Sequence, residues 1–301
     1  MSCCPANSLG KALVNTPGSG NVHTMYQDTP NQRSSQTQQD SMQLYLTGAP
    51  LSVTRRIVVV FSDVFGYSSG RHFQFADNLA AALTTTETPT TVVVPDLFRN
   101  NPAMQLWPYL PEKVALAVAL PGMLYRCKYS YHADYVVSAL EDLILPWLKH
   151  QTSSTSSTSS TSSNPIAYSS VGFCYGGWAV ATTIVRGIKW ECGVGIHPAF
   201  NLEQVHGGSE ESLALGVACK EVPYFLMPAG NDSDEIKVGG VCVGLMAKGR
   251  SVLEEDVSLC FPEMKHGWQT RGNPRECAVL AAQELALSKA AEFIQRHHSC
   301  L

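Results

Sequence analysis

The chain reads Ala167-Tyr-Ser-Ser-Val-Gly-Phe-Cys-Tyr-Gly-Gly-Trp-Ala-Val180 near its middle, and this stretch predicts a short buried strand, a tight turn and then a helix. Cys174 stands at the tip of the turn, and Gly172, Gly176 and Gly177 surround it. A strand that reverses directly into a helix crowds the flanking positions, so only residues without a Cβ atom fit there. The turn would therefore hold the sulfur beside the free N–H groups that begin the helix, which stabilise a thiolate or an oxyanion.

The pattern Gly-x-Cys-x-Gly-Gly is typical of a nucleophile elbow, with sulfur in place of a serine hydroxyl. Most cysteines are inert small hydrophobic residues, so a structural thiol is the simplest interpretation of any one of the ten cysteines taken alone. Cys174 differs because it alone combines glycine at −2 and +2 with a strand before it and an apolar helix after it. A phosphate-binding loop is the alternative, but its glycine spacing differs and no acidic residue ends a following strand.

The composition is typical of a soluble globular protein, with 45% hydrophobic and 15% charged residues among 301. The formal net charge of −4 and the pI near 6.1 give no electrostatic basis for binding nucleic acid or an anionic membrane. No apolar run reaches the length of a membrane span, since the longest, 114–120, stops at Pro121.

The cysteines have neither the spacing of a metal site nor that of a disulfide framework, and no signal-peptide h-region follows Met1. We therefore expect reduced thiols, a cytoplasmic location, and no metal or cofactor. Cys3 and Cys4 could be acylated or bind metal, but no supporting motif is present, and an exposed thiol pair in a tail is favoured. We expect a monomer or a weak homodimer.

Residues 1–40 are rich in polar residues, Gly and Pro and show no hydrophobic periodicity, which predicts a flexible arm. Strands and helices alternate over 41–301, which predicts a single α/β domain with a doubly wound, mostly parallel sheet flanked by helices. Strands are expected at 42–47 (an edge strand), 55–61, 91–95, 167–173, 192–196, 221–227 and 257–261. Helices are expected at 71–83, at 132–149 with Pro146 kinking or ending it, directly after Cys174, at 235–248 and at 274–295.

Two stretches depart from this alternation. Residues 100–130 combine prolines with an apolar, aromatic sequence, and we expect a lid-like excursion over the pocket. Residues 151–164 are almost entirely Ser and Thr, a composition that cannot bury a face. Because this insert joins a helix to a strand, at the edge opposite the active-site end of a parallel sheet, it predicts a surface loop without a catalytic role.

Four polar loops follow predicted strands, and the carboxyl ends of parallel strands meet at one edge of a sheet. The loops carry Asp63, Cys174, the pair Asp232 and Asp234, and His266. The order nucleophile, acid, histidine is the one expected for a triad on such a sheet. A thiol with an ordinary pKa near 8.5 needs a histidine to generate the thiolate, and that histidine needs an acid to fix its tautomer and offset its charge.

Some of these assignments have competitors. Asp232 is favoured as the acid because it ends the turn directly, whereas Asp234 stands where it would N-cap the next helix. His197 also follows a strand, but it precedes the acid loop, which disfavours it as the base. His72 and His206 flank possible pocket loops and stay open, and the remaining histidines are expected to be solvated.

Four motifs follow one another along the chain: Asp63-Val-Phe-Gly66, Val94-Pro-Asp-Leu-Phe98, Gly172-Phe-Cys-Tyr-Gly-Gly177 and His266-Gly-Trp268. Together they resemble the motifs of the dienelactone hydrolase family, over about residue 43 to the C-terminus. The start Cys3-Cys4-Pro5 is also similar to that of eukaryotic members. The resemblance implies an α/β-hydrolase fold.

The resemblance also implies a mechanism, namely hydrolysis of a lactone or activated ester through a thioester on Cys174, with His266 and Asp232 completing the triad. It implies that the backbone N–H groups of Val64 and Tyr175 form the oxyanion hole. A non-catalytic small-molecule binding protein on the same fold is the alternative. A thiol redox sensor would need a resolving cysteine near Cys174, and the sequence offers none nearby.

Two features depart from the bacterial pattern. Asp63 stands where the bacterial enzymes carry a glutamate that helps to activate the thiol, and aspartate is one methylene shorter. Arg99 and Arg271 lie in the loops that hold a substrate carboxylate in the family, but each is offset by one residue, and an ordinary surface ion pair is as good an interpretation. Trp268, next to His266, is a further substrate-binding candidate.

Overall fold

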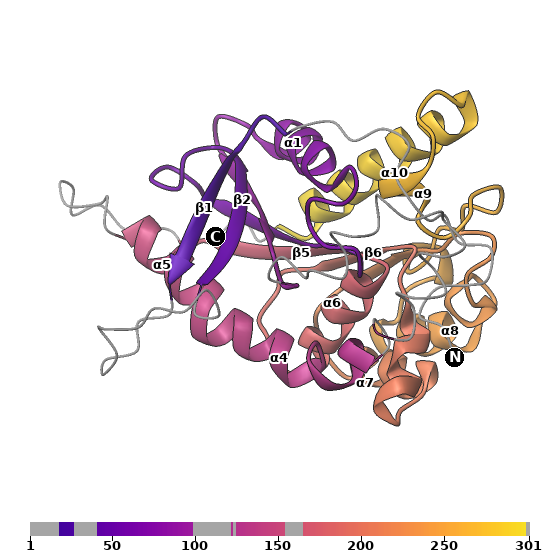
Figure 1. Ribbon diagram of the computed structural model, residues 1–301. Coiled ribbons are helices and arrows are strands. Elements are labelled where there is room, and N and C mark those ends of the chain that lie inside the picture. The colour runs from indigo at the N-terminus through magenta and orange to yellow at the C-terminus, as the bar shows by residue number, and fades with distance from the viewer. Residues whose placement is uncertain (1–17, 27–40, 99–121, 123–124, 154–164, 299–301) are drawn as a thin grey trace.

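A computed structural model describes residues 18–26, 41–98, 122, 125–153 and 165–298. They form a mixed seven-stranded sheet with the order β1-β2-β4-β3-β5-β6-β7 (Figure 1). All pairs from β4 to β7 are parallel, whereas β2 pairs with both β1 and β4 in the antiparallel sense. The strands are β1 (Asn21–Tyr26), β2 (Ser41–Gly48), β3 (Arg56–Phe61), β4 (Thr90–Pro95), β5 (Ala167–Phe173), β6 (Gly193–Ile196) and β7 (Tyr224–Met227).

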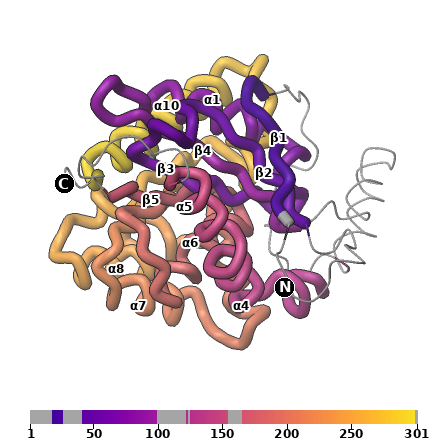
Figure 2. The backbone as a smooth tube through the Cα atoms, turned by 90° about the vertical axis from the view of Figure 1, so that its left-hand side faces the viewer, coloured from indigo at the N-terminus to yellow at the C-terminus, as the bar shows by residue number. Residues whose placement is uncertain are grey.

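Helices cover both faces of the sheet, which confirms the predicted α/β layers. Helices α1 and α10 lie on one face, and α4, α6, α7 and α8 lie on the other (Figure 1, Figure 2). Side chains of β3 alternate between the layers, with Val58 and Val60 packing in the first core and Val59 and Phe61 in the second. The α-helices are α1 (His72–Leu83), α4 (Ala133–Ser138), α5 (Leu145–Ser153), α6 (Tyr175–Val185), α7 (Glu210–Ala218), α8 (Val241–Arg250), α9 (Trp268–Arg271) and α10 (Cys277–Arg296); the other helical turns are the π-helix η3 (Ala139–Ile144) and the 3₁₀ turns η4 (Phe200–His206), η5 (Asp234–Ile236) and η6 (Glu254–Asp256).

Strand β1 corrects the expectation of an unstructured arm over 1–40. Its six residues pair with β2, from Asn21 opposite Leu46 to Tyr26 opposite Ser41. Residues 42–47 were predicted to form an edge strand, but β2 lies between β1 and β4. Met25 is buried in the core. Its burial depends on the pairing of β1 with β2, and so short a segment shows no hydrophobic periodicity from which it could be predicted. The rest of the predicted arm, 1–17 and 27–40, lies outside the described residues.

The predicted helix at 132–149 is interrupted but not ended by Pro146. Helix α4 passes into η3 and then into α5, so Pro146 is the second residue of α5, which continues to Ser153. The wider π turn, in which the Leu145 N–H bonds to the Leu140 carbonyl, ends just before the proline. Proline has no N–H and its ring collides with the preceding α-helical turn, so a wide turn is where a helix can accept it.

Three later elements differ from the prediction. Helix α7 was not predicted, and residues 235–248 form η5 and then α8, because Gly239, at a φ of +88°, breaks the run between them. The segment 257–261 is not a regular strand and pairs with the end of β7 only through isolated bridges, Leu226 to Ser258 and Ala229 to Phe261. Pro228 lies between the bridged residues Leu226, in β7, and Ala229, just after it, and has no N–H to continue the ladder.

The two unusual stretches lie largely outside the described residues. The expected lid at 100–130 is described only from 125 onward, where 125–129 are helical, and at position 122. The Ser/Thr insert is described only at its beginning, where residues 151–153 finish α5.

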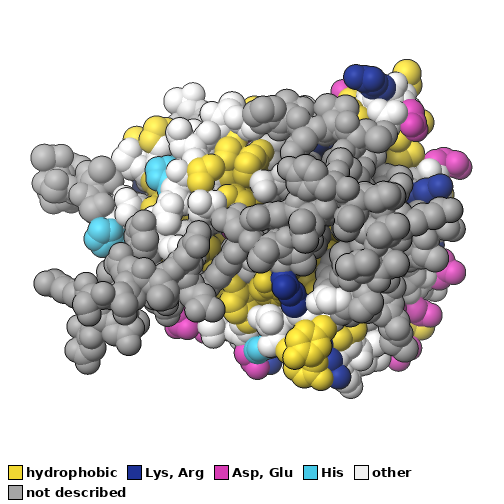
Figure 3. Space-filling view, in the orientation of Figure 1, with side chains coloured by type: hydrophobic (Ala, Val, Ile, Leu, Met, Phe, Trp, Pro, Cys, Tyr) yellow, Lys and Arg dark blue, Asp and Glu magenta, His cyan; other side chains and the backbone are white. Residues whose placement is uncertain are grey.

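Acidic and basic side chains are interspersed along the right-hand edge of the face in Figure 3. The helices within the described ranges lack any stretch with the length and hydropathy of a transmembrane segment.

Candidate active site

The elbow joins β5 to α6, as the sequence predicts. Cys174 adopts a φ of +52° and a ψ of −114°, a left-handed conformation that is rare for residues with a side chain, and its side chain is fully buried. A Cβ atom on Gly172 would lie 2.1 Å from the Gly176 carbonyl oxygen, and one on Gly176 would lie 2.2 Å from the Phe61 carbonyl oxygen. The two glycines therefore allow the main chains of β3, β5 and α6 to approach closely enough to form the turn.

Main-chain hydrogen bonds hold this turn from the side of β6. The Cys174 N–H donates to the Ile196 carbonyl (3.3 Å), and the Cys174 carbonyl accepts from the Ala199 N–H (2.9 Å). The same carbonyl also accepts from the Gly177 N–H (3.0 Å) in the first turn of α6. The backbone on both sides of the sulfur is thus fixed by neighbouring elements.

His266 and Asp232 form a buried pair next to this cysteine. His266 Nδ1 lies 2.5 Å from Asp232 Oδ1, and both side chains are at most 3% exposed. The other carboxylate oxygen, Oδ2, accepts from the Ala229 N–H (2.7 Å), and Asn231 Oδ1 accepts from the His266 N–H (2.6 Å). Hydrogen bonds from the loop of Asn231 and Asp232 therefore hold both the ring and the main chain of His266.

The charge on His266 is stabilised by its two neighbours. Burial would lower the pKa of His266, but the charges of Asp232 and Cys174, and hydrogen bonds to both side chains, raise the pKa to about 10. With Nδ1 directed at the carboxylate, Nε2 is the atom available to the sulfur. The structure therefore brings the side chains of Cys174, His266 and Asp232 together.

Asp234, the competing acid, lies apart from this group. Its side chain is 94% exposed and forms an ion pair with Lys237 Nζ at 2.7 Å. It begins the short turn η5, which is capped by Ser233. The carboxylate that contacts His266 is that of Asp232.

Two backbone N–H groups in the loops around the elbow lack an acceptor among the described residues. Tyr175 is the first residue of α6, so its N–H has no acceptor within the helix, and Val64 lies in the loop after β3. Within the part of the chain that the structure describes, neither N–H donates a hydrogen bond. These are the two donors that the family resemblance assigns to an oxyanion hole.

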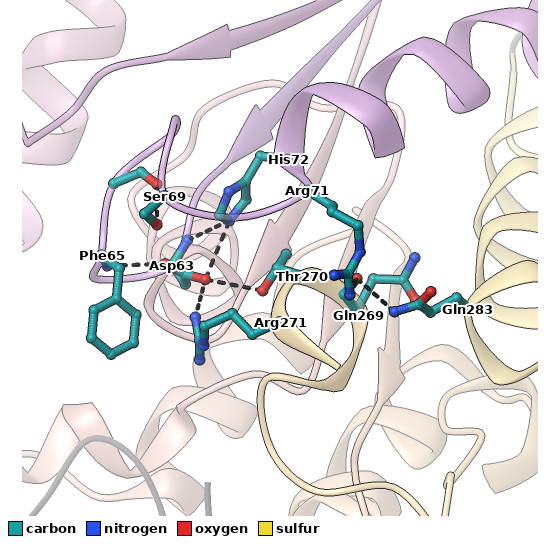
Figure 4. Close-up of polar contacts among 10 residues, drawn as sticks. Asp63, Phe65, Ser69, Arg71, His72, Gln269, Thr270, Arg271 and Gln283 are labelled. Carbon is teal, nitrogen blue, oxygen red and sulfur yellow. Dashed lines mark hydrogen bonds and ion pairs between the residues drawn. The ribbon is translucent and has the colours of Figure 1, made fainter. Parts of the chain in front are cut away.

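Asp63 lies in a second buried cluster, drawn in Figure 4. Its carboxylate forms an ion pair with Arg271 Nη1 and accepts hydrogen bonds from Thr270 Oγ1 (3.0 Å) and the Phe65 N–H (2.9 Å). His72 Nε2 lies 3.3 Å from Asp63 Oδ2. Burial by itself would raise the pKa of Asp63, but the charges of Arg271 and His72 hold the pKa well below its ordinary value.

This cluster changes the interpretation of two predicted site residues. The contacts of the Asp63 carboxylate go to the histidine-loop helix α9, to His72 and to its own loop, not to the Cys174 thiol. Arg271 is 1% exposed, with its guanidinium 4.4 Å above the centre of the Phe65 ring, so it is not part of a surface ion pair. The cluster joins the loop that carries Val64 to the helix that follows His266.

The remaining predicted residues are placed as follows. Trp268 is completely buried, with its ring 4.6 Å from that of Phe261. Arg99 lies outside the described residues. His206 is stacked on Trp178, with 4.9 Å between ring centres.

Sequence analysis missed two contributions to this site. Asn231, which holds the His266 main chain, directly precedes Asp232, and a run of polar residues after a strand is a signal that could have indicated it. Thr270 left no comparable signal, because it lies 207 residues from Asp63 in the sequence; His72, left open by the sequence, is placed beside Asp63. A groove of about 550 Å³, lined in part by His23, Leu51 and Trp147, lies elsewhere, between the β1–β2 pair and α5.

The fold resembles those of several solved hydrolases. An esterase from Pyrobaculum calidifontis superposes with a TM-score of 0.53 at 14% identity, over 93% of this chain and 86% of that one. A dienelactone hydrolase-like promiscuous phosphotriesterase from metagenomic libraries has a TM-score of 0.50 at 13% identity, over 92% of this chain and 99% of that one. An esterase from Pyrococcus furiosus also has a TM-score of 0.50 at 12% identity, over 96% and 98% of the two chains.

Comparison of the sequence with family models and with curated proteins finds no match. At 12–14% identity the structural likeness concerns the fold. The layers, the parallel strands β4 to β7 and the elbow after β5 all agree with it. The chain therefore has the α/β-hydrolase fold.

Proposed function

We propose that this protein is a cysteine-dependent hydrolase of activated esters, thioesters or lactones. The observation that carries the proposal is the buried His266, paired with Asp232 at 2.5 Å and close enough to Cys174 for the two side chains to interact electrostatically. Esterase and dienelactone hydrolase-like relatives in fold support the same reaction class.

The proposed reaction begins with attack of the Cys174 thiolate on the substrate carbonyl carbon, which forms a C–S bond and moves an electron pair to the carbonyl oxygen. The N–H groups of Val64 and Tyr175 donate to that oxyanion. As the C=O bond re-forms, the C–O bond of the ester breaks, and the leaving alkoxide takes the proton from His266 Nε2. The product of this half-reaction is a thioester on Cys174.

Water completes the cycle. His266 Nε2 takes a proton from water as its oxygen attacks the thioester, and the second tetrahedral species collapses by breaking the C–S bond. The carboxylic acid leaves, and the thiolate–imidazolium pair is restored. A thiolate is a better leaving group than an alkoxide, so amides and unactivated esters should be poor substrates, and strained lactones, aryl esters and thioesters should be good ones.

The charge balance of the site supports an uncharged acyl group. Of the two arginines predicted to hold a substrate carboxylate, the structure describes Arg271, and its charge is already neutralised by Asp63 in a buried ion pair. Freeing it for an anion would leave the Asp63 carboxylate buried without its counter-ion, which costs several kcal/mol. We therefore expect p-nitrophenyl butyrate to be hydrolysed faster than p-nitrophenyl hemisuccinate.

Activity of single variants tests the proposal. Cys174→Ala should abolish hydrolysis of p-nitrophenyl butyrate, and Asp232→Asn should lower kcat by about 100-fold or more, because the wrong His266 tautomer is then favoured. Asp234→Asn is the matched control, since the same change is made to an exposed carboxylate two residues away, and it should retain wild-type kcat. Turnover that survives in Cys174→Ala would overturn the proposal, and stoichiometric binding without turnover would favour a binding protein instead.

A further inference from the structure

His197 lies at the end of β6, between the elbow and the histidine loop, and the proposed reaction gives it no role. Its side chain is fully buried and its backbone has a φ of +40°. Within the described residues, the non-glycine residues with positive φ are Cys174, His197 and Ser251. Two of these three therefore belong to the candidate active site, where stored backbone strain is most often found.

The turn at His197 is coupled to the elbow. The residue before it, Ile196, accepts the hydrogen bond from the Cys174 N–H, and Ala199, two residues after it, donates to the Cys174 carbonyl. His197 itself is anchored by its N–H to the Met227 carbonyl at 2.9 Å, at the end of β7. The turn that carries the His197 ring is thus fixed to both the elbow and the end of β7.

The ring of His197 packs directly against that of His266. The two ring centres are 5.0 Å apart with an angle of 66° between the planes, an edge-to-face contact. Phe173 (5.9 Å) and Trp268 (6.4 Å) surround the His197 ring on other sides. Asp232 therefore contacts the His266 imidazole at Nδ1, and the His197 ring contacts it from a second direction.

His197 is uncharged in this position. Burial first, and then the charges of His266 and Arg271, lower its pKa well below the ordinary value, with Asp63 acting weakly in the opposite direction. Its Nδ1 and Nε2 atoms have no hydrogen-bond partner among the residues that the structure describes. A buried polar ring with unpaired nitrogens lowers stability, so its presence calls for a functional explanation.

We propose that His197 is a positioning residue, whose uncharged ring holds the plane of the His266 imidazole so that Nε2 stays directed at Cys174. The inference rests on the proposed role of His266 as the base. A neutral ring suits this position, because a cation there would repel the imidazolium that forms on His266. A flexible side chain would not restrict the tilt of the imidazole.

The variant His197→Asn tests this role, since asparagine tolerates positive φ and keeps the turn but removes the ring. We expect kcat for p-nitrophenyl butyrate to fall by about 10- to 100-fold with KM changed by less than about threefold, since a misaligned base costs rate rather than binding. The matched control is His206→Asn, which removes a ring stacked on Trp178, and it should leave kcat within about twofold of wild type.

A second readout does not require turnover. The rate at which iodoacetamide modifies Cys174, followed by mass spectrometry of its peptide between pH 5 and 9, reports the thiolate that His266 stabilises. In His197→Asn the midpoint of this profile should move toward that of an ordinary thiol, by about one pH unit, and His206→Asn should overlay wild type. If wild type hydrolyses no ester, the proposed function fails, yet the alkylation profile still decides the role of His197.

A His197→Asn variant with wild-type kcat and a wild-type alkylation profile would overturn the proposal, even if its stability were lower. If the asparagine variant does not fold, His197→Gly replaces it, since glycine accepts the same φ without strain. Failure of both variants to fold would also overturn the proposal, because His197 would then be a requirement of folding.

Discussion

Replacing Asp63 by asparagine should destabilise the protein far more than the loss of one surface charge would. The carboxylate is completely buried and its ion-pair partner Arg271 is 1% exposed, so the substitution would remove the carboxylate that faces a guanidinium shielded from water. Asparagine can still accept from the Phe65 N–H, but its NH₂ group would face the donors Arg271 and Thr270. Removing one partner of a buried pair typically costs about 3–5 kcal/mol, and we expect Asp63→Asn to fall in that range.

Urea denaturation measures this free energy of unfolding. The matched control is Glu292→Gln, which breaks an exposed ion pair (Glu292 is 46% and Lys289 41% exposed) and should leave the midpoint of urea denaturation close to that of wild type. The double variant Asp63→Asn/Arg271→Met should be more stable than the sum of its single variants predicts, because each single change removes one partner of a buried ion pair and the double change removes both.

The pH dependence of the Asp63→Asn effect follows from the lowered pKa of Asp63 in the folded protein. A carboxyl group with a depressed folded-state pKa stabilises above its unfolded pKa, near 3.9, and loses that contribution as the pH falls toward the folded value. The cost of Asp63→Asn should therefore be constant from pH 8 to 5 and shrink only below about pH 4. A cost under about 1 kcal/mol at pH 7, or additive single and double variants, would refute the argument.

Two further predictions concern the elbow and the imidazole. Gly176→Ala should lower the free energy of unfolding by at least about 3 kcal/mol and abolish esterase activity, since its Cβ would lie 2.2 Å from the Phe61 carbonyl oxygen. The control is Gly187→Ala, at a φ of +91° with no atom within 4 Å, which should lower it by about 1 kcal/mol from backbone strain alone. Because the folded pKa of His266, about 10, exceeds its unfolded value of 6.5, its contribution of up to about 5 kcal/mol is complete below pH 6.5 and lost as the pH rises through 10. The stability gap between wild type and His266→Gln should therefore narrow from pH 6 to pH 10, and a gap that widens would contradict this assignment of the charge.

The parts of the fold that were predicted correctly are those with a strong local signal. The elbow follows from glycines that permit close main-chain contacts, and β3 and β4 are continuous β-branched runs buried on both faces. Strand β1 was missed because its stability comes from pairing with β2 and from the burial of Met25, neither of which leaves a pattern in six residues. The segment 257–261 looked like a strand by composition, but its partner segment contains Pro228.

In the candidate site, too, the residues with a local sequence signal were predicted and those without one were not. Chain order and position after strands were enough to select Cys174, Asp232 and His266, which the structure brings together. Contacts between residues far apart in the sequence left no local signal, so neither the contacts of Asp63 with Thr270 and Arg271 nor the ring contact of His197 could be predicted from the sequence. The role of Asp63 in activating the thiol came from resemblance alone and remains a prediction.

The way the elbow is built makes the attacking atom interchangeable. The backbone conformation at Cys174 is maintained by main-chain bonds to Ile196 and Ala199 and by the absence of Cβ atoms at Gly172 and Gly176. A serine would fit the same turn and aim its oxygen at the same two amides. An architecture of this kind can therefore exchange sulfur for oxygen by a single-atom change, and so move between substrates of different reactivity while the scaffold is conserved.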